Sequence, residues 1–104
     1  FWTVTGTNTG TVAWGLSGIA VTNDATINTA FGTAAVTTAL AHSGTSNDLM
    51  VSVESGAITI AGSPSVDDVC FFQINRDVSA DNQSGDARLL GIKLFFTTDA
   101  TNDA

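Results

Sequence analysis

Apolar and polar residues alternate along two long runs in the last third of the chain, residues 67–77 and 87–98. One face of the first run consists of Cys70, Phe72 and Ile74, and one face of the second consists of Leu90, Ile92, Leu94 and Phe96. An alternation with a period of two is typical of a β-strand that buries one face. Both runs are therefore predicted to be strands. The turn-forming residues 78–86 between them predict a loop.

Shorter runs of the same kind come earlier in the chain. They predict strands over residues 1–5, 11–22, 33–42, 48–54 and 57–61. The run 33–42 is ambiguous because its alanines tolerate a helix, whereas Val36 and the threonine pair after it favour a strand. A short helical turn could start at Asp24, which has the chemistry of an N-cap. Many short strands with turns between them predict an all-β fold, an antiparallel β-sandwich of the jelly-roll type.

The length of 104 residues predicts one domain, residues 1–104. The chain begins at Phe1 without a methionine, inside a predicted strand. We expect further strands upstream, which would make these residues the C-terminal part of a longer protein.

The charge of the chain narrows the range of partners. The formal net charge is −7, and the only basic residues are Arg76, Arg88 and Lys93. Binding to nucleic acid needs clustered lysine and arginine, so a nucleic-acid partner is not expected. An anionic membrane surface is disfavoured for the same reason, and no stretch approaches the roughly 20 apolar residues of a membrane span.

The residue types that usually carry catalysis are scarce. His42 is the only histidine and Cys70 the only cysteine. We expect Cys70 to be a buried, inert thiol because it lies on an apolar strand face. His42 then has no companion for a metal site or an acid–base pair, and we expect it in a loop or at a strand end. No Gly-x-Ser-x-Gly motif is present. No catalytic residue, metal or cofactor is predicted, and an enzyme is the weakest hypothesis.

The acidic loop after residue 76 is the best candidate for binding a ligand. Asp77, Asp81 and Asp86 offer oxygen atoms of the kind that Ca²⁺ prefers. Their spacing does not match an EF-hand, and the simpler interpretation is that they form the turn and keep it soluble. The pair Asp67–Asp68 is interpreted as a charged strand entry that discourages edge pairing.

A second candidate is a surface of outward-facing apolar residues. If the even-numbered positions of the last two strands face inward, Phe71, Leu89 and Phe95 face outward. Such residues indicate a second packed layer or a subunit interface. A sugar-binding platform is the alternative, although Trp14 alternates with the inward set and only Trp2 remains open for that role.

Five segments carry a resemblance to a known family. They are Val-Ala-Trp-Gly (12–15), Ala-Phe-Gly-Thr (30–33), Ala-Ile-Thr-Ile-Ala-Gly-Ser-Pro (57–64), Phe-Gln-Ile-Asn-Arg-Asp (72–77) and Gly-Asp-Ala-Arg-Leu-Leu-Gly-Ile-Lys-Leu-Phe-Phe-Thr-Thr-Asp-Ala (85–100). Together they resemble a family of small virion-associated proteins of tailed bacteriophages, over nearly the whole chain. The segments are strands and turns, so they indicate a fold lineage better than an activity.

The resemblance implies a structural β-sandwich protein located in the virion, without catalytic residues. It implies that Trp14 anchors the core, that Gly15 allows a close backbone approach and that residues 62–64 form a turn. Arg76 would pair with a neighbouring acid such as Asp86 or Asp77, or else would lie at a solvated strand end.

The function expected from the resemblance is that of a capsid decoration or cement protein. Its partners would be the major capsid protein or other virion proteins, and a homo-oligomer, most simply a trimer, would suit the three-fold positions of a virion lattice. The alternative is a tail or head-fibre module that binds a carbohydrate or another receptor.

Overall fold

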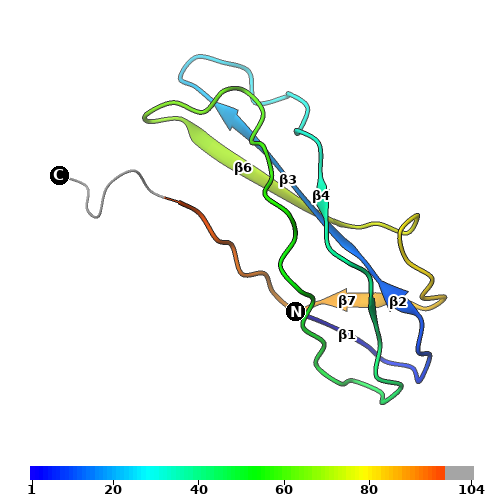
Figure 1. The fold of residues 1–104 in the computed structure, drawn as a ribbon. Coiled ribbons are helices and arrows are strands. Elements are labelled where there is room, and N and C mark those ends of the chain that lie inside the picture. The colour runs from blue at the N-terminus through cyan, green and yellow to red at the C-terminus, as the bar shows by residue number, and fades with distance from the viewer. Residues whose placement is uncertain (98–104) are drawn as a thin grey trace.

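The computed structural model describes residues 1–97 and shows an all-β chain (Figure 1). Its strands are β1 (Trp2–Val4), β2 (Thr11–Val12), β3 (Trp14–Val21), β4 (Ala35–Val36), β5 (Leu40–Ala41), β6 (Val69–Arg76) and β7 (Ala87–Leu89). Residues 1–97 contain no helix, and hence none that is long and apolar enough to cross a membrane. The predicted all-β class is confirmed.

The strands form three small sheets in which every pairing is antiparallel. One sheet has the order β4-β3-β6, and the other two are the pairs β1-β7 and β2-β5. The ladder of β3 and β6 runs from Trp14 opposite Arg76 to Val21 opposite Val69. This ladder forms the long axis of the molecule, and the two smaller sheets lie at one end of it (Figure 1).

The densest core lies at the end that holds the small sheets. Trp2 and Val12 are fully buried there, and Val4 and Trp14 pack with them. The indole Nε1 of Trp2 donates a hydrogen bond to Ser52 Oγ at 3.0 Å, so the ring is buried with its polar atom satisfied. The expected burial of Trp14 is confirmed.

Two of the predicted strands are interrupted. The run 11–22 breaks at Ala13, whose carbonyl oxygen accepts a hydrogen bond from Asp77 N, so that β2 and β3 join different sheets. The run 33–42 breaks around Thr37, which bonds Trp14 twice: its N–H donates to Trp14 O, and its Oγ1 accepts from Trp14 N. Both bonds keep the register of the adjoining ladder, because Ala13 opposite Asp77 continues the β3–β6 pairing and Thr37 opposite Trp14 continues the β3–β4 pairing. At Thr37 the side-chain Oγ1 accepts the N–H of Trp14.

Two other predicted strands and the helical turn are absent from the described residues. The segments 48–54 and 57–61 each form one isolated bridge, Met50 with Trp2 and Ala61 with Ile19. Their alternation is real, but no neighbouring segment of residues 1–97 extends the pairing beyond one point. Asp24 begins no helix; it lies in a turn with a left-handed φ of 64°.

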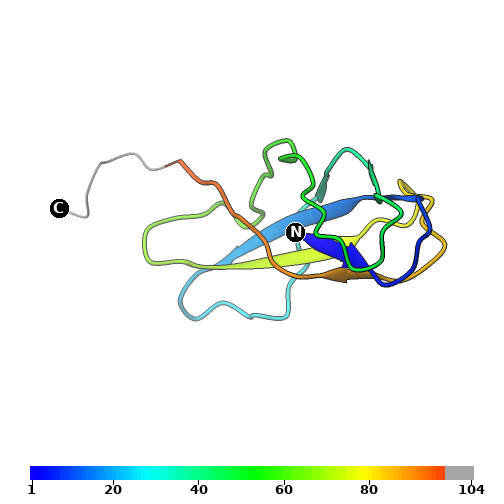
Figure 2. The same ribbon diagram turned by 90° about the horizontal axis from the view of Figure 1, so that it is seen from below.

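The run 87–98 is also shorter as a strand than predicted. β7 ends at Leu89, and residues 90–97 continue as an extended segment that leaves the sheets (Figures 1 and 2). Only its start is held, by hydrogen bonds from Leu90 N and Gly91 N to Phe1 O. The expected inward residues Leu90, Ile92, Leu94 and Phe96 are therefore exposed. Residues 98–100, which complete the last family segment, lie outside the described residues.

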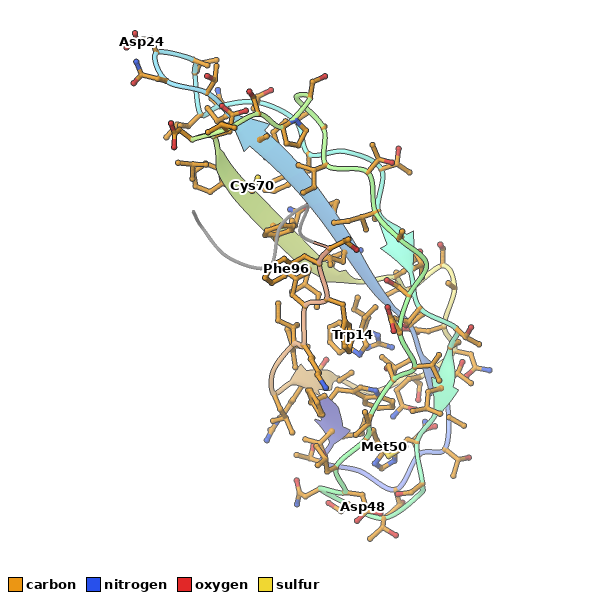
Figure 3. The ribbon with its side chains drawn as sticks, turned by 60° about the vertical axis from the view of Figure 1, so that its left-hand side comes forward. Trp14, Asp24, Asp48, Met50, Cys70 and Phe96 are labelled. Atoms are coloured by element: carbon orange, nitrogen blue, oxygen red, sulfur yellow. The ribbon has the colours of Figure 1, made fainter. Side chains whose placement is uncertain are left out.

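Cys70 is exposed, and the prediction that its thiol is buried is wrong (Figure 3). The residue lies on β6, which is an edge strand of the three-stranded sheet. Ile74 on the same strand packs against the core, but Cys70 lies toward the other end, where the described residues do not cover that face. Alternation thus gave the face correctly but not whether anything covers it.

Candidate functional site

Arg76 organises the loop between β6 and β7. Its Nε donates to Asp81 Oδ2 at 2.7 Å and its Nη2 to Asp81 Oδ1 at 2.9 Å, which makes a two-pronged ion pair. The remaining donors reach the backbone: Nη1 bonds Gly85 O at 2.8 Å and Nη2 bonds Gln83 O. The side chain of Arg76, at the end of β6, is therefore hydrogen-bonded to three residues of the loop and holds the loop against the strand end.

The electrostatics of this pair follow from its geometry. The Asp81 side chain is only 2% exposed and that of Arg76 is 19% exposed. The hydrogen bonds from Arg76 hold the pKa of Asp81 below its ordinary value, and the same bonds raise the pKa of Arg76. The expected pairing of Arg76 with a neighbouring acid is thus confirmed, but the acid is Asp81 instead of Asp86 or Asp77.

The structure does not bring the three aspartates of the predicted calcium loop together as ligands. Asp81 is occupied by a guanidinium group, which would repel a cation. Asp77 accepts hydrogen bonds from Ser79 N and Oγ, and these bonds lower the pKa of Asp77. Residues 1–97 contain no group of three or more acidic, histidine or cysteine side chains that could hold a metal ion. The turn-forming interpretation accounts for the contacts of Asp77 and Asp81.

His42 is buried beside Trp2. It directly follows β5, as expected for a strand end, but it is only 2% exposed and its ring lies 6.1 Å from the Trp2 ring, centroid to centroid. Its Nδ1 lies 3.0 Å from Asn8 O, the geometry of a hydrogen bond donated by Nδ1, and its Nε2 contacts no polar atom of the described residues. Leu40 lies two residues before His42 and therefore on the same face of the strand. Its apolar side chain is the signal in the sequence that this face is buried. Among the described residues, no acidic side chain is hydrogen-bonded to His42.

Polar contacts also tie the loop 82–86 to the start of β2. Asn82 Oδ1 accepts from Thr11 N at 2.6 Å, and Gln83 N donates to Thr11 O at 3.0 Å. Gln83 is buried, and a Cβ added at Gly10 would collide with its backbone. These contacts position the loop that Arg76 closes, and nothing in the sequence pattern pointed to Gln83.

The two tryptophans do not offer a sugar-binding platform. Trp2 is fully buried, and Trp14 is almost so. A hollow of about 450 Å³ lies between residues 32–35 and 57–61, but only glycine, alanine, threonine and isoleucine line it. That hollow offers no titratable side chain for catalysis and no aromatic ring on which a sugar could stack.

The predicted interface residues are all exposed. Phe71 lies on β6, Leu89 on β7 and Phe95 in the segment that follows β7, with exposed fractions of 43%, 39% and 59%. Many further large apolar side chains are exposed with them, including Leu49, Val51, Val53, Val69, Phe72, Leu90, Ile92, Leu94 and Phe96. This uncovered apolar surface is the most unusual feature of the molecule, because soluble monomers rarely expose large apolar patches.

Comparison with known protein families, with curated proteins and with solved structures found no match to this chain.

Proposed function

We propose that the chain is a non-enzymatic structural protein of a bacteriophage virion, a capsid decoration or cement protein that stabilises the phage head. Its strands would belong to a β-sandwich of the jelly-roll type. Its partners would be the major capsid protein or other virion proteins together with further copies of itself, in a trimer.

The observation that carries the proposal is the uncovered apolar surface. A decoration protein works by burying one of its surfaces on a partner, and burial contributes about 25 cal/mol for each Å² of apolar area. The exposed side chains on β6, β7 and the following segment supply such a surface. The resemblance of the sequence to virion proteins of tailed phages suggests that the assembly in which this surface becomes buried is a phage virion.

The chemistry of the described residues favours a structural role over an enzymatic one. His42 is packed against Trp2, and Arg76 is engaged by its own loop. Neither side chain is presented to a substrate. The buried tryptophans also weaken the alternative role of a fibre module that binds sugars through them.

The proposal is tested by quantitative mass spectrometry of purified particles of a phage whose genome encodes this chain. The measurement is the copy number of the chain relative to the shell protein. A fixed ratio with copies on the order of hundreds supports a capsid decoration role. About a dozen copies would replace that role by the tail or fibre module. Absence from the particles would overturn the virion proposal.

A further inference from the structure

The charges of the chain are segregated along the sequence. Residues 87–97 carry Arg88 and Lys93 and no acidic residue, whereas residues 1–86 carry eight acidic residues and only Arg76 as a base. Arg76 is neutralised by Asp81, in the one ion pair that the described part of the chain forms. The two cations that are not engaged in it thus lie on β7 and on residues 90–97, which we call the C-terminal arm.

The arm has the pattern of a strand but no strand to pair with. Leu90, Ile92, Leu94 and Phe96 alternate along it, and all are exposed. Figures 1 and 2 show the arm running away from the sheets of its own chain. Its eight residues would span about 26 Å when extended.

β6 offers an edge of the same length. It has eight residues and pairs with β3 on one side, and within residues 1–97 its backbone makes no hydrogen bond on the other side. In an antiparallel ladder, alternate N–H and C=O groups of an edge strand point outward and can accept a further strand. Val69 and Phe71 on this strand are exposed, and Asp67, Asp68 and Asp77 flank it.

The surface area of the chain indicates how much contact is missing. The solvent-accessible surface is 6980 Å², whereas a compact chain of 10.6 kDa exposes about 5,500 Å². Even if about 1,000 Å² of this total came from residues 98–104, the remaining surface would exceed the roughly 5,200 Å² of a compact chain of residues 1–97 by about 800 Å². About 800 Å² on each partner is the size of a standard stable interface.

We propose that the C-terminal arm of one copy adds as a strand to the free edge of β6 in a second copy, and that this exchange holds a homo-oligomer together. The backbone pairing supplies affinity. The arm's alternating apolar residues meet Val69 and Phe71, and the positive charge of Lys93 is attracted by the acidic residues that flank β6. The inference rests on the proposed self-association of the chain, and it adds the two surfaces that meet.

Cys70 reports on this contact because it is an exposed thiol on β6. Light scattering gives the mass of the 104-residue chain at concentrations from about 5 to 500 µM, and a thiol reagent gives the modification rate of Cys70. We expect a mass of at least two chains and a modification rate that falls at least tenfold as the concentration rises.

Substitutions in the arm show whether the chain associates through this contact or through another surface. Ile92→Asp is expected to weaken association at least a hundredfold and to restore fast modification of Cys70; Lys93→Glu is expected to weaken it about tenfold at low salt. Val53→Asp is the matched control, because Val53 is exposed to a similar degree but lies on neither surface. Circular dichroism checks that each variant keeps its fold, which we expect because both arm residues are exposed in the single chain.

Disulfide trapping supplies a positive test. Phe95→Cys, which lies on the opposite face of the arm from Leu94 and hence on the face of Cys70, should form a disulfide-linked species of twice the chain mass with Cys70 of a second copy, and Cys70→Ser should abolish that linkage. A chain that stays monomeric at 500 µM overturns the proposal, as does association that Ile92→Asp leaves unchanged. A monomeric chain present in virions would refute the arm exchange alone, whereas an arm-linked oligomer absent from virions would refute the virion role alone.

Discussion

A single arginine illustrates how one residue can order a loop. The planar guanidinium of Arg76 matches the carboxylate of Asp81 and still has donors left for Gln83 O and Gly85 O. Lysine has the charge but cannot supply this fork of donors. The loop from β6 to β7, and with it the start of the C-terminal arm, therefore depends on the identity of this residue.

The Arg76–Asp81 pair makes stability depend on pH. The pKa of Asp81 is lower in the folded chain than in the unfolded chain, where it lies near its ordinary value of about 3.9. The unfolded chain therefore binds more protons in acid, and the stabilisation, which is complete above about pH 5, is lost as the pH falls through the lowered pKa. Asp81→Asn should lower the free energy of unfolding at pH 7 by about 1–3 kcal/mol and should flatten its decline below pH 5.

Urea unfolding between pH 3 and pH 7 measures both effects. Glu54→Gln is the control, because Glu54 is an exposed acid and such surface changes alter the free energy of unfolding by about 0.5 kcal/mol or less. Parallel stability curves for Asp81→Asn and the unchanged chain would show that the pair contributes no pH dependence.

At the scale of elements, the segment before β6 docks on β3 through a few backbone contacts. Ala20 N donates to Ala61 O at 2.8 Å, and Ala61 N donates to Gly18 O at 3.1 Å. Gly62 then turns the chain with a left-handed φ of 84°. A side chain at this position would meet the carbonyl oxygen of Ala20, so the docking needs a glycine there.

Gly62→Ala should therefore destabilise the fold, by about 1–3 kcal/mol, because it adds both backbone strain and a steric clash. Gly56→Ala is the matched control, since no atom lies within 4 Å of its added Cβ and its φ is not positive. We expect the control to leave the free energy of unfolding unchanged or slightly higher. Equal thermal midpoints for the two variants would contradict the role assigned to Gly62.

At the scale of the whole molecule, the fold is open. The dense core occupies one end, around Trp2 and Trp14, and large apolar side chains remain exposed along β6 and the arm. Figure 3 shows how far the chain extends between Asp24 at one end and Asp48 at the other. A molecule of this kind gains stability from whatever covers its surface.

The thermal midpoint should consequently depend on protein concentration, because association stabilises the folded chain by mass action. We expect a rise of about 5–10 °C for a hundredfold increase in concentration, measured by circular dichroism. The variant Ile92→Asp should show a midpoint that is independent of concentration. A constant midpoint in the unchanged chain would mean that its apolar surface is not covered by further copies.

Local pattern in the sequence was enough to establish the all-β class, the long strand β6, the loop after it and the burial of Trp14. Alternation and turn chemistry are properties of neighbouring residues, so these features need no knowledge of distant contacts. Three features were decided by the tertiary structure alone. They are the burial of Trp2 and His42, the pairing of Arg76 with Asp81, and the exposure of Cys70 and of the arm. Each of these depends on which segments meet in space, as when Met50 pairs with Trp2, and a strand pattern shows which face is apolar but not what will cover it.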